Sequence, residues 1–411
     1  MLGRGVDQIL PYPSDPTLHE SCVKNAEEYV RLAVEKNGVI PKPVAFSYVW
    51  GDALAWFERW SPDVRIINLE TSITMSEDYW RDKSIHYRMN PLNVQCLTAA
   101  KIDCCALANN HVMDWGITGL METVATLSKA GIKSCGAGGN ILEAEEPAVF
   151  DVKRNCRVLV FSVGSKSSGI PSDWAALKDR AGVNLITDLS DEGIHNLAEE
   201  VAENKRDGDV VVVSIHWGGN WGYDIPLEQR SFAHRLIDQA GVDVVYGHSS
   251  HHVKGLEVYR KKLILYGCGD FLNDYEGIVP FSRSRRQFIV KLKSSRLGRR
   301  MLDKSASILL PKKAFRSDLC LMYFARVDAE SGVCLSLDMV PMQIRRFRIC
   351  RASQDDVKWM RRLLGREQKG TMVGINVKEK GLLPLLAGGN CHSLIVTLRS
   401  DESGHRINYF G

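Results

Sequence analysis

The sequence predicts an α/β protein with a largely parallel sheet. Short runs rich in β-branched residues alternate with segments of helical periodicity, which is typical of strands connected by helices. The runs are almost continuously apolar, as expected for strands that are covered on both faces. The strand-like runs are Val64–Glu70, Asp103–Asn109, Arg157–Gly164, Asp209–Trp217, Asp243–Gly247 and Lys262–Phe271.

The segments between these strands have apolar residues at helical spacing. In "ITGLMETVATLSKAGI", for example, Gly131 marks the end of the helix. The expected helices are Asp52–Trp60, Gly119–Ala130, Ser190–Asn204 and Leu227–Ala240. After Ala314 the pattern changes to a β-hairpin and a further strand, followed by an amphipathic helix at Gln354–Glu367. The tail 368–411 is weakly patterned, and one domain is expected to span 1–411.

Composition narrows the class of protein. Of the 411 residues 45% are hydrophobic and 25% charged, which is ordinary for a globular chain, and no apolar run is long enough for a transmembrane segment. The N-terminus is too polar, and too interrupted by proline, for a secretory signal. The 11 cysteines form no C-x-x-C pair, which favours free thiols in a reducing compartment and a cytoplasmic location.

Basic charge is concentrated in one segment. Residues 279–314 hold eleven Lys and Arg residues against one acid, Asp303, so the rest of the chain is mildly acidic despite a net charge of +4. That balance argues against nucleic acid as a partner. The segment is either a basic arm for an anionic polymer, a membrane surface or nucleic acid, or a disordered loop. We favour the loop, because the segment interrupts a strand connection without contributing to any motif.

Polar side chains gather where the predicted strands end, which is where α/β sheets bind ligands. Taken singly, His216 could be a core histidine, Glu70 a helix cap and "NNH" a turn, and Asp270–Asp274 is best explained as a polar turn. Together, carboxylate, amide and imidazole groups are the donors that a divalent cation with mixed N/O ligands requires. The remaining set is Asn68, Asn109, Asn110, His111, Asp114, His248, His251 and His252.

Four motifs carry a resemblance to a family. "INLETSIT", "ALANNHVMDWG", "SIHWGGNWG" and "GHSSHHVKGLEVY…LILYGCGDF" resemble the CapA/PgsA-type capsule (poly-γ-glutamate) synthesis proteins, which look like relatives of the calcineurin-like metallophosphatases. The resemblance covers about Met1–Ile278 and Phe315–Ser353. It implies a metallophosphatase-like β-sandwich flanked by helices (α/β/β/α). It also implies two divalent metal ions, manganese, iron or zinc rather than magnesium, because several ligands are imidazoles.

The resemblance also implies roles for individual residues. His111 would act beside the scissile bond as acid or electrostatic stabiliser, together with Asp114. His252 would be a second-layer or exposed residue, and the "GGNWGY" loop would cover the site. The implied metal ligands are Glu70, Asn110, His216, His248 and His251. The candidate substrate contacts are Asn68, Asn109, Arg88 and Trp217, although a salt-bridged arginine and a core tryptophan are simpler explanations of the last two.

One expected element is missing from the sequence. In the family, a first strand ending in Gly-Asp precedes the stretch seen here as "MLGRGVD", and that aspartate supplies a metal ligand. The chain begins at Met1 of that stretch, so the sheet is expected to have an unpaired slot. We expect the natural protein to extend upstream, and such an extension would leave a membrane-anchored or extracellular location open as an alternative to the cytoplasm.

The function expected from these features is a metal-dependent hydrolase of metallophosphatase type. It would make or process poly-γ-glutamate or a related anionic polymer, with an anionic polymer or phosphoester as substrate and a capsule synthase complex as candidate partner. The alternative is a non-catalytic accessory protein that binds polymer or synthase, which the missing aspartate favours.

Overall fold

The computed structural model describes residues 1–21, 23–152, 156–278 and 315–367, and the backbone of three further strands. The segment 279–314, predicted as a basic loop, lies outside the described residues. So does the tail 368–411, except for β18 (Gly374–Ile375), β19 (Leu383–Leu386) and β20 (Ser393–Arg399).

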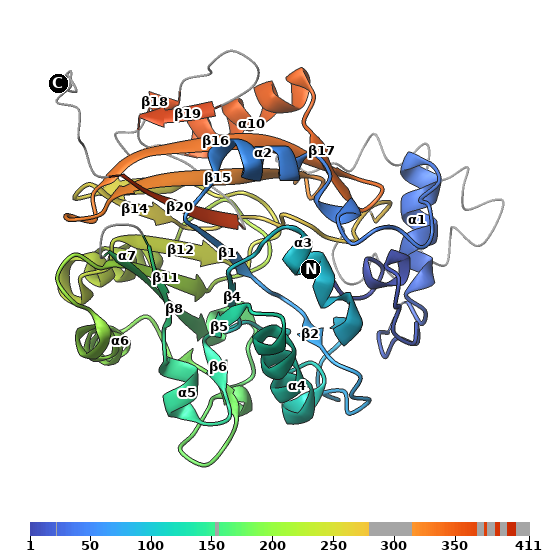
Figure 1. The fold of residues 1–411 in the computed structure, drawn as a ribbon, viewed down its shortest axis with the longest axis horizontal. Coiled ribbons are helices and arrows are strands. Elements are labelled where there is room, and N and C mark those ends of the chain that lie inside the picture. The colour runs from blue at the N-terminus through green and yellow to red at the C-terminus, as the bar shows by residue number, and fades with distance from the viewer. Residues whose placement is uncertain are drawn as a thin grey trace.

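Two sheets form the centre of the molecule (Figure 1). In the described part of the chain, the first sheet has nine strands in the order β18-β19-β16-β15-β20-β1-β4-β5, with β17 beside β16. Only part of it is parallel, because β1 pairs in parallel with β4, and β15 antiparallel with β16. The bounds of the newly named strands are β1 (Val64–Asn68), β4 (Cys104–Ala106), β5 (Lys133–Cys135), β15 (Leu319–Asp328), β16 (Cys334–Arg345) and β17 (Arg348–Arg351).

The second sheet contains the long parallel run that the sequence predicts. Its seven described strands have the order β10-β8-β11-β12-β14-β13, with β7 beside β8. Strands β8, β11, β12 and β14 are parallel to one another, whereas β7 is antiparallel to β8 and β13 is antiparallel to β14. The bounds are β7 (Ala148–Asp151), β8 (Arg157–Ser165), β10 (Leu185–Ile186), β11 (Val210–His216), β12 (Val244–His248), β13 (Leu256–Tyr259) and β14 (Lys262–Leu265).

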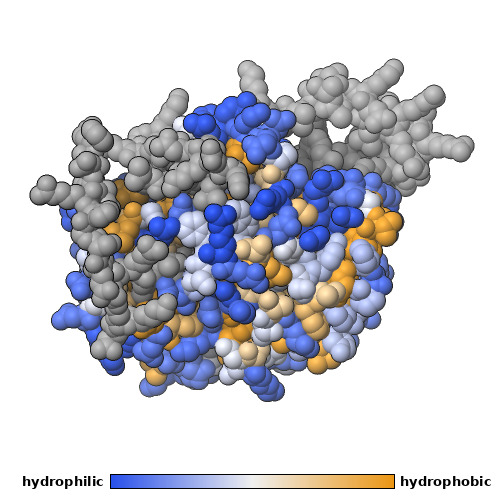
Figure 2. All heavy atoms as spheres, turned by 45° about the horizontal axis from the view of Figure 1, so that its top comes forward, coloured by the Kyte–Doolittle hydropathy of each residue, from blue (hydrophilic) through white to orange (hydrophobic). Residues whose placement is uncertain are grey.

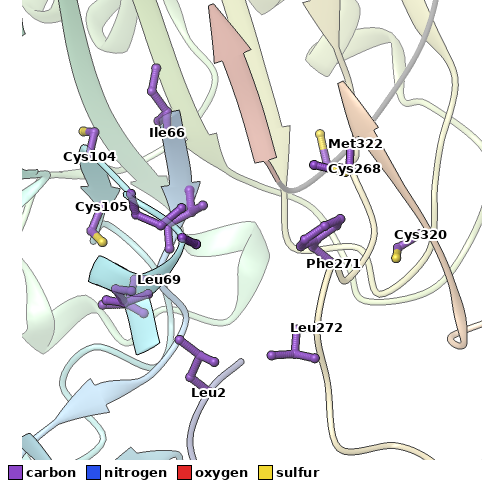
Figure 3. Packing of buried hydrophobic residues seen from close by; sticks show 14 of the residues in the cluster. Leu2, Ile66, Leu69, Cys104, Cys105, Cys268, Phe271, Leu272, Cys320 and Met322 are labelled. Atoms are coloured by element: carbon purple, nitrogen blue, oxygen red, sulfur yellow. The ribbon is translucent and has the colours of Figure 1, made fainter. Parts of the chain in front are cut away.

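Alternating side chains bury both faces of the second sheet. Val158 and Val160 of β8 belong to the core shared with the first sheet, whereas Leu159 and Phe161 face the core formed with α6 (Asp191–Asn204) and α7 (Leu227–Ala240). Strands covered on both faces read as continuous apolar runs, which is why the sequence revealed them. Figure 3 shows Ile66, Cys104 and Met322 of the first sheet in the shared core.

Helices cover the outer faces of the two sheets, so the predicted β-sandwich flanked by helices is confirmed. In Figure 1, α2 (Ala53–Trp60) and α10 (Gln354–Glu367) lie over the first sheet, and Trp60 stacks on Phe324 of β15 with ring centroids 5.1 Å apart. The other helices and short strands are α1 (Glu27–Asn37), α3 (Gln95–Ala99), α4 (Gly116–Lys129), α5 (Ile141–Glu145), β2 (Ser72–Ile73), β3 (Arg88–Met89), β6 (Ala137–Gly138) and β9 (Gly182–Val183).

The prediction that the first sheet has an unpaired slot is wrong. Strand β20 lies between β1 and β15, antiparallel to β1 and parallel to β15. The backbone groups on that side of β1 therefore have partners. A segment of the weakly patterned tail thus completes the middle of the sheet.

Among the described residues, no helix has the length and apolar character needed to cross a membrane. The face of the molecule drawn in Figure 2 is mainly hydrophilic where it is coloured, with hydrophobic residues in small separate patches. Small apolar patches are normal on protein surfaces and do not by themselves indicate a binding face.

Candidate metal and catalytic site

The polar strand ends of both sheets meet in one place. Asn110, which follows β4 of the first sheet, contacts His216 at the end of β11 in the second sheet, with Oδ1 and Nε2 3.1 Å apart. The strand-end pattern alone predicted one edge of a single sheet. The family resemblance implied the end of a β-sandwich, and that is where these residues lie.

Glu70, Asn110 and His216 form the first group. His216 Nε2 lies 3.1 Å from Asn110 Oδ1 and 3.9 Å from Glu70 Oε1. Ligands bound to one ion at about 2.0–2.2 Å lie about 3–4 Å from each other, so these separations fit a shared divalent cation. The donors also match, since carboxylate, amide oxygen and imidazole suit such an ion.

The environment of Glu70 also fits a cation. Burial raises the pKa of Glu70 to about 7, and Asp270 adds to this rise, while His251 opposes it. A cavity of about 40 Å³ is lined by both carboxyl-bearing residues, Glu70 and Asp270, which is enough room for an ion or a water molecule. Met1 also lines this cavity, and its ammonium group already places positive charge near both carboxylates, to which a bound cation would add.

His248 contacts the first group through His216. The two Nδ1 atoms lie 2.6 Å apart, and His248 Nε2 is 2.7 Å from the hydroxyl of Ser214. Two imidazole lone pairs cannot face each other at this distance, so one of the two nitrogens carries a proton and donates it to the other. The structure thus brings His248 to the site, in contact with a neighbouring ligand candidate.

His251 pairs with an aspartate that the sequence reasoning passed over. Its Nδ1 lies 3.0 Å from Asp270 Oδ1, and both side chains are buried. Burial lowers the pKa of His251, but Asp270 and Glu70 outweigh it and raise the pKa above its ordinary value. The expectation that Asp270–Asp274 is only a polar turn is wrong, because Asp270 and Asp274 are almost fully buried and both are paired.

His111 and Asp114 form a hydrogen-bonded pair. His111 Nδ1 lies 2.6 Å from Asp114 Oδ2, which also accepts a 2.7 Å hydrogen bond from the Tyr87 amide. A carboxylate can only accept, so Nδ1 carries the proton and Nε2 is the available nitrogen. Burial lowers the pKa of His111 to about 4, and Asp114 opposes this effect.

Lys83 is a site residue that sequence reasoning missed. Its ammonium group contacts Asp114 Oδ1 and the backbone carbonyl of Asn110, and lies 3.4 Å from His111 Nδ1. The residue lies in a loop without periodicity. No motif marked it, and the only signal available was a lysine shortly before "HYRMNP".

Two of the predicted substrate contacts, Asn68 and Asn109, are engaged in holding the site together. Asn109 donates from Nδ2 to Asn68 Oδ1 and to the Leu69 carbonyl, and its Oδ1 accepts from the amides of His111 and Val112. Asn68 in turn donates to Glu70 Oε2 at 3.0 Å. These bonds set the path of the chain after β1 and β4.

Arg88 and Trp217 have partners elsewhere. The Arg88 guanidinium donates to the carbonyls of Ser76 and Asp15 and lies 4.0 Å from the centre of the Trp115 ring. Within the described residues, no hydrogen bond joins it to the histidines. Trp217 is 2% exposed and belongs to the core beside α7, so the simpler explanation of this tryptophan holds.

The predicted covering loop does lie against the histidines. Asn220 accepts from the His251 amide through its carbonyl, and the Trp221 ring lies 5.5 Å from that of His251. Trp221 is 38% exposed and therefore lines the rim of the site. His252 is 2% exposed, so exposure is excluded, and its ring packs near Trp221 and Phe315.

Within the part of the chain that the structure describes, no three His, Cys, Asp or Glu side chains converge closely enough to hold a metal ion by themselves. The first group differs in that an asparagine supplies its third donor. The predicted ligands thus form two neighbouring groups. Glu70, Asn110, His216 and His248 make up one, and His251 with Asp270 makes up the other, beside Glu70.

Comparisons with known proteins agree with the four motifs. Residues 1–275 match the family described as "Bacterial capsule synthesis protein PGA_cap". The chain is 44% identical over 394 residues, 96% of its length and 95% of the relative's, to a probable polyglutamine synthesis accessory protein of Mycobacterium tuberculosis. It is 28% identical over 240 residues to the PGA biosynthesis protein CapA of Bacillus subtilis, covering 56% of this chain and 58% of that protein.

Among solved structures, a phosphatase from Mycoplasma pneumoniae aligns with 70% of this chain and 91% of its own, at 10% identity and a TM-score of 0.28. That similarity is too low to carry a functional argument. The family match spans well over half of the chain, and the mycobacterial relative is similar along nearly its whole length. The chain belongs to the PGA_cap family of bacterial capsule synthesis proteins.

Proposed function

We propose that the protein is a metal-dependent hydrolase of an anionic polymer or phosphoester in polyglutamate-type capsule synthesis. One observation carries the proposal. Asn110, which groups with Glu70 and His216, directly precedes His111, which is hydrogen-bonded to Asp114. Cation ligands and a hydrogen-bonded His–Asp pair on adjacent residues are the components that hydrolysis at phosphorus or at an acyl carbon requires.

Glu70, Asn110 and His216 would hold one divalent cation, and His251 with Asp270 would extend the site around Glu70. The two contacts 3.1 and 3.9 Å from His216 Nε2 support the first assignment, and the 3.0 Å contact between His251 and Asp270 supports the second. A cation bound there supplies Lewis-acid polarisation and activation of water.

His111 would bind and release a proton at Nε2. Asp114 fixes the ring with the Nδ1 proton inward, so Nε2 is directed away from Asp114. With a pKa of about 4 His111 is neutral at pH 7, and an anionic substrate beside Nε2 would raise that pKa and favour the acidic form that protonates a leaving oxygen.

The test combines metal content with turnover. Purified protein would be loaded with Mn²⁺, measured by plasma mass spectrometry, and assayed with bis(p-nitrophenyl) phosphate. His216→Ala should lose both metal and activity. His195→Ala, on the exposed face of α6, is the matched control and should lose neither. Folded wild-type protein without bound metal would refute the proposal.

A second candidate function is a non-catalytic accessory role in polymer synthesis. The observation in its favour is that the 44% identical mycobacterial relative is a probable polyglutamine synthesis accessory protein. Bound metal without turnover of phosphoester or poly-γ-glutamate, together with retention of that polymer on the immobilised protein, would favour this role over hydrolysis.

A further inference from the structure

We propose that Lys83 is a positioning residue of the site, which fixes the turn from Asn110 to Asp114 and thereby aims the His111 ring. This inference rests on the proposed hydrolytic function. None of the four motifs contains Lys83, and it comes from a separate segment of the chain. Its role follows from what its ammonium group touches.

Lys83 joins the two ends of the turn. One contact is to the backbone carbonyl of Asn110, whose side chain lies against His216, and the other is to Asp114 Oδ1. One ammonium group therefore links the residue that would bind the cation to the residue that orients His111. The three donors of an ammonium group allow both contacts at once.

The other hydrogen bonds of Asp114 show which of its oxygens Lys83 contacts. Oδ2 accepts from the Tyr87 amide at 2.7 Å and from His111 Nδ1 at 2.6 Å, which leaves Oδ1 to Lys83. Since His111 Nδ1 and Lys83 are both donors, the 3.4 Å between them is not a hydrogen bond. Lys83 therefore acts on His111 through the carboxylate of Asp114.

The segment that carries Lys83 is itself attached to the turn. The Trp80 amide donates to the Asp114 carbonyl at 2.8 Å, and the Lys83 amide donates to the Trp80 carbonyl at 3.3 Å. The Lys83 ammonium also lies 4.9 Å from the centre of the Trp174 ring. The Lys83 side chain is 12% exposed. It reaches the His111–Asp114 pair alongside the Trp174 ring, which shields the ammonium charge from water.

Three variants test this role. Lys83→Met keeps the length of the side chain but removes the charge and the donors. Lys83→Arg keeps a cation, and Lys83→Ala leaves space for an added amine. Lys129→Met, at the exposed end of α4, is the matched control. Each would be loaded with Mn²⁺ and assayed with bis(p-nitrophenyl) phosphate, with metal content measured in parallel.

We expect Lys83→Met to lower kcat at least tenfold with KM changed less than threefold and metal stoichiometry retained. Lys83→Arg should recover part of kcat, and propylamine should restore activity to Lys83→Ala in a saturable manner. A merely structural lysine would not give amine rescue or a selective loss of kcat. Wild-type kcat in Lys83→Met would overturn the inference.

If the wild-type protein has no turnover, the proposed function fails, and the role of Lys83 is then decided by nitrogen NMR of the His111 ring. In the wild-type protein the Nδ1–H tautomer is expected. A changed tautomer or loss of a single ring state in Lys83→Met, with no change in Lys129→Met, supports positioning. An unchanged His111 spectrum overturns it.

Discussion

Replacing Glu200 with glutamine should stabilise the protein in alkaline solution. Glu200 lies on α6, and burial raises its pKa to about 8, with neighbouring Glu145 adding to the rise. Asn184 opposes the rise through a 3.3 Å hydrogen bond from its Nδ2 to Glu200 Oε2. The folded state therefore favours the protonated acid, whereas the unfolded chain ionises near 4.5.

The sign and size of the effect follow from these two values. Below pH 4.5 Glu200 is protonated in both states, so its burial does not lower the free energy of unfolding. As pH rises from 4.5 to about 8 the unfolded state loses this proton first, so the free energy of unfolding falls; above about pH 8 the loss is constant. At about 1.36 kcal/mol for each tenfold change in proton affinity, the upper bound is about 5 kcal/mol. The side chain is partly exposed, so solvent screening reduces the expected loss to roughly 2–3 kcal/mol.

The assay is urea unfolding followed by circular dichroism at pH 5, 7 and 9. Glu200→Gln should unfold at a higher urea concentration than wild type at pH 9 and near the same concentration at pH 5. The neighbouring Glu199, whose side chain is 65% exposed, provides the control Glu199→Gln, which should match wild type throughout. Equal midpoints of wild type and Glu200→Gln at pH 9 would refute the reasoning.

Three further predictions concern the site and its support. His216→Ala should lose bound Mn²⁺ in mass spectrometry of a folded protein, and full retention of the metal would contradict the ligand assignment. Asp114→Asn should lower kcat about 100-fold with metal retained, because an amide has one acceptor oxygen and its NH2 group would face a donor, either Lys83 or His111 Nδ1; activity within threefold of wild type would contradict this. Arg4→Met should cost about 3–5 kcal/mol in urea unfolding, since it leaves the buried carboxylates of Asp274 and Glu20 unpaired. An unchanged midpoint for Arg4→Met would show that those carboxylates find other partners.

Local sequence patterns predicted the elements of the fold better than their pairing. The parallel strands of the second sheet are apolar on both faces, so their composition alone revealed them. The place of β20 beside β1 could not be read from sequence, because pairing between distant strands leaves no local periodicity.

The same limit applies to the site. The residues that end strands, such as His216 and His248, were found because strand ends are marked by the pattern before them. Asp270 and Lys83 lie in loops, and their contacts depend on how those loops return to the site. Trp217 shows the converse error, since it follows directly after His216 but lies in the core.

The position of β20 has a consequence for synthesis of the protein on the ribosome. About 325 residues separate the end of β1 from the start of β20, and the two are neighbours in the sheet. At about 5–20 residues per second, β1 waits roughly 15–65 s for the strand that pairs with it. During that time β1 lacks this pairing partner on the nascent chain, and β15, which ends at Asp328, lacks its β20 partner only while the last part of that interval is translated. The last strand to join the first sheet is therefore one in its middle, and it is available only after nearly all of the chain has been translated.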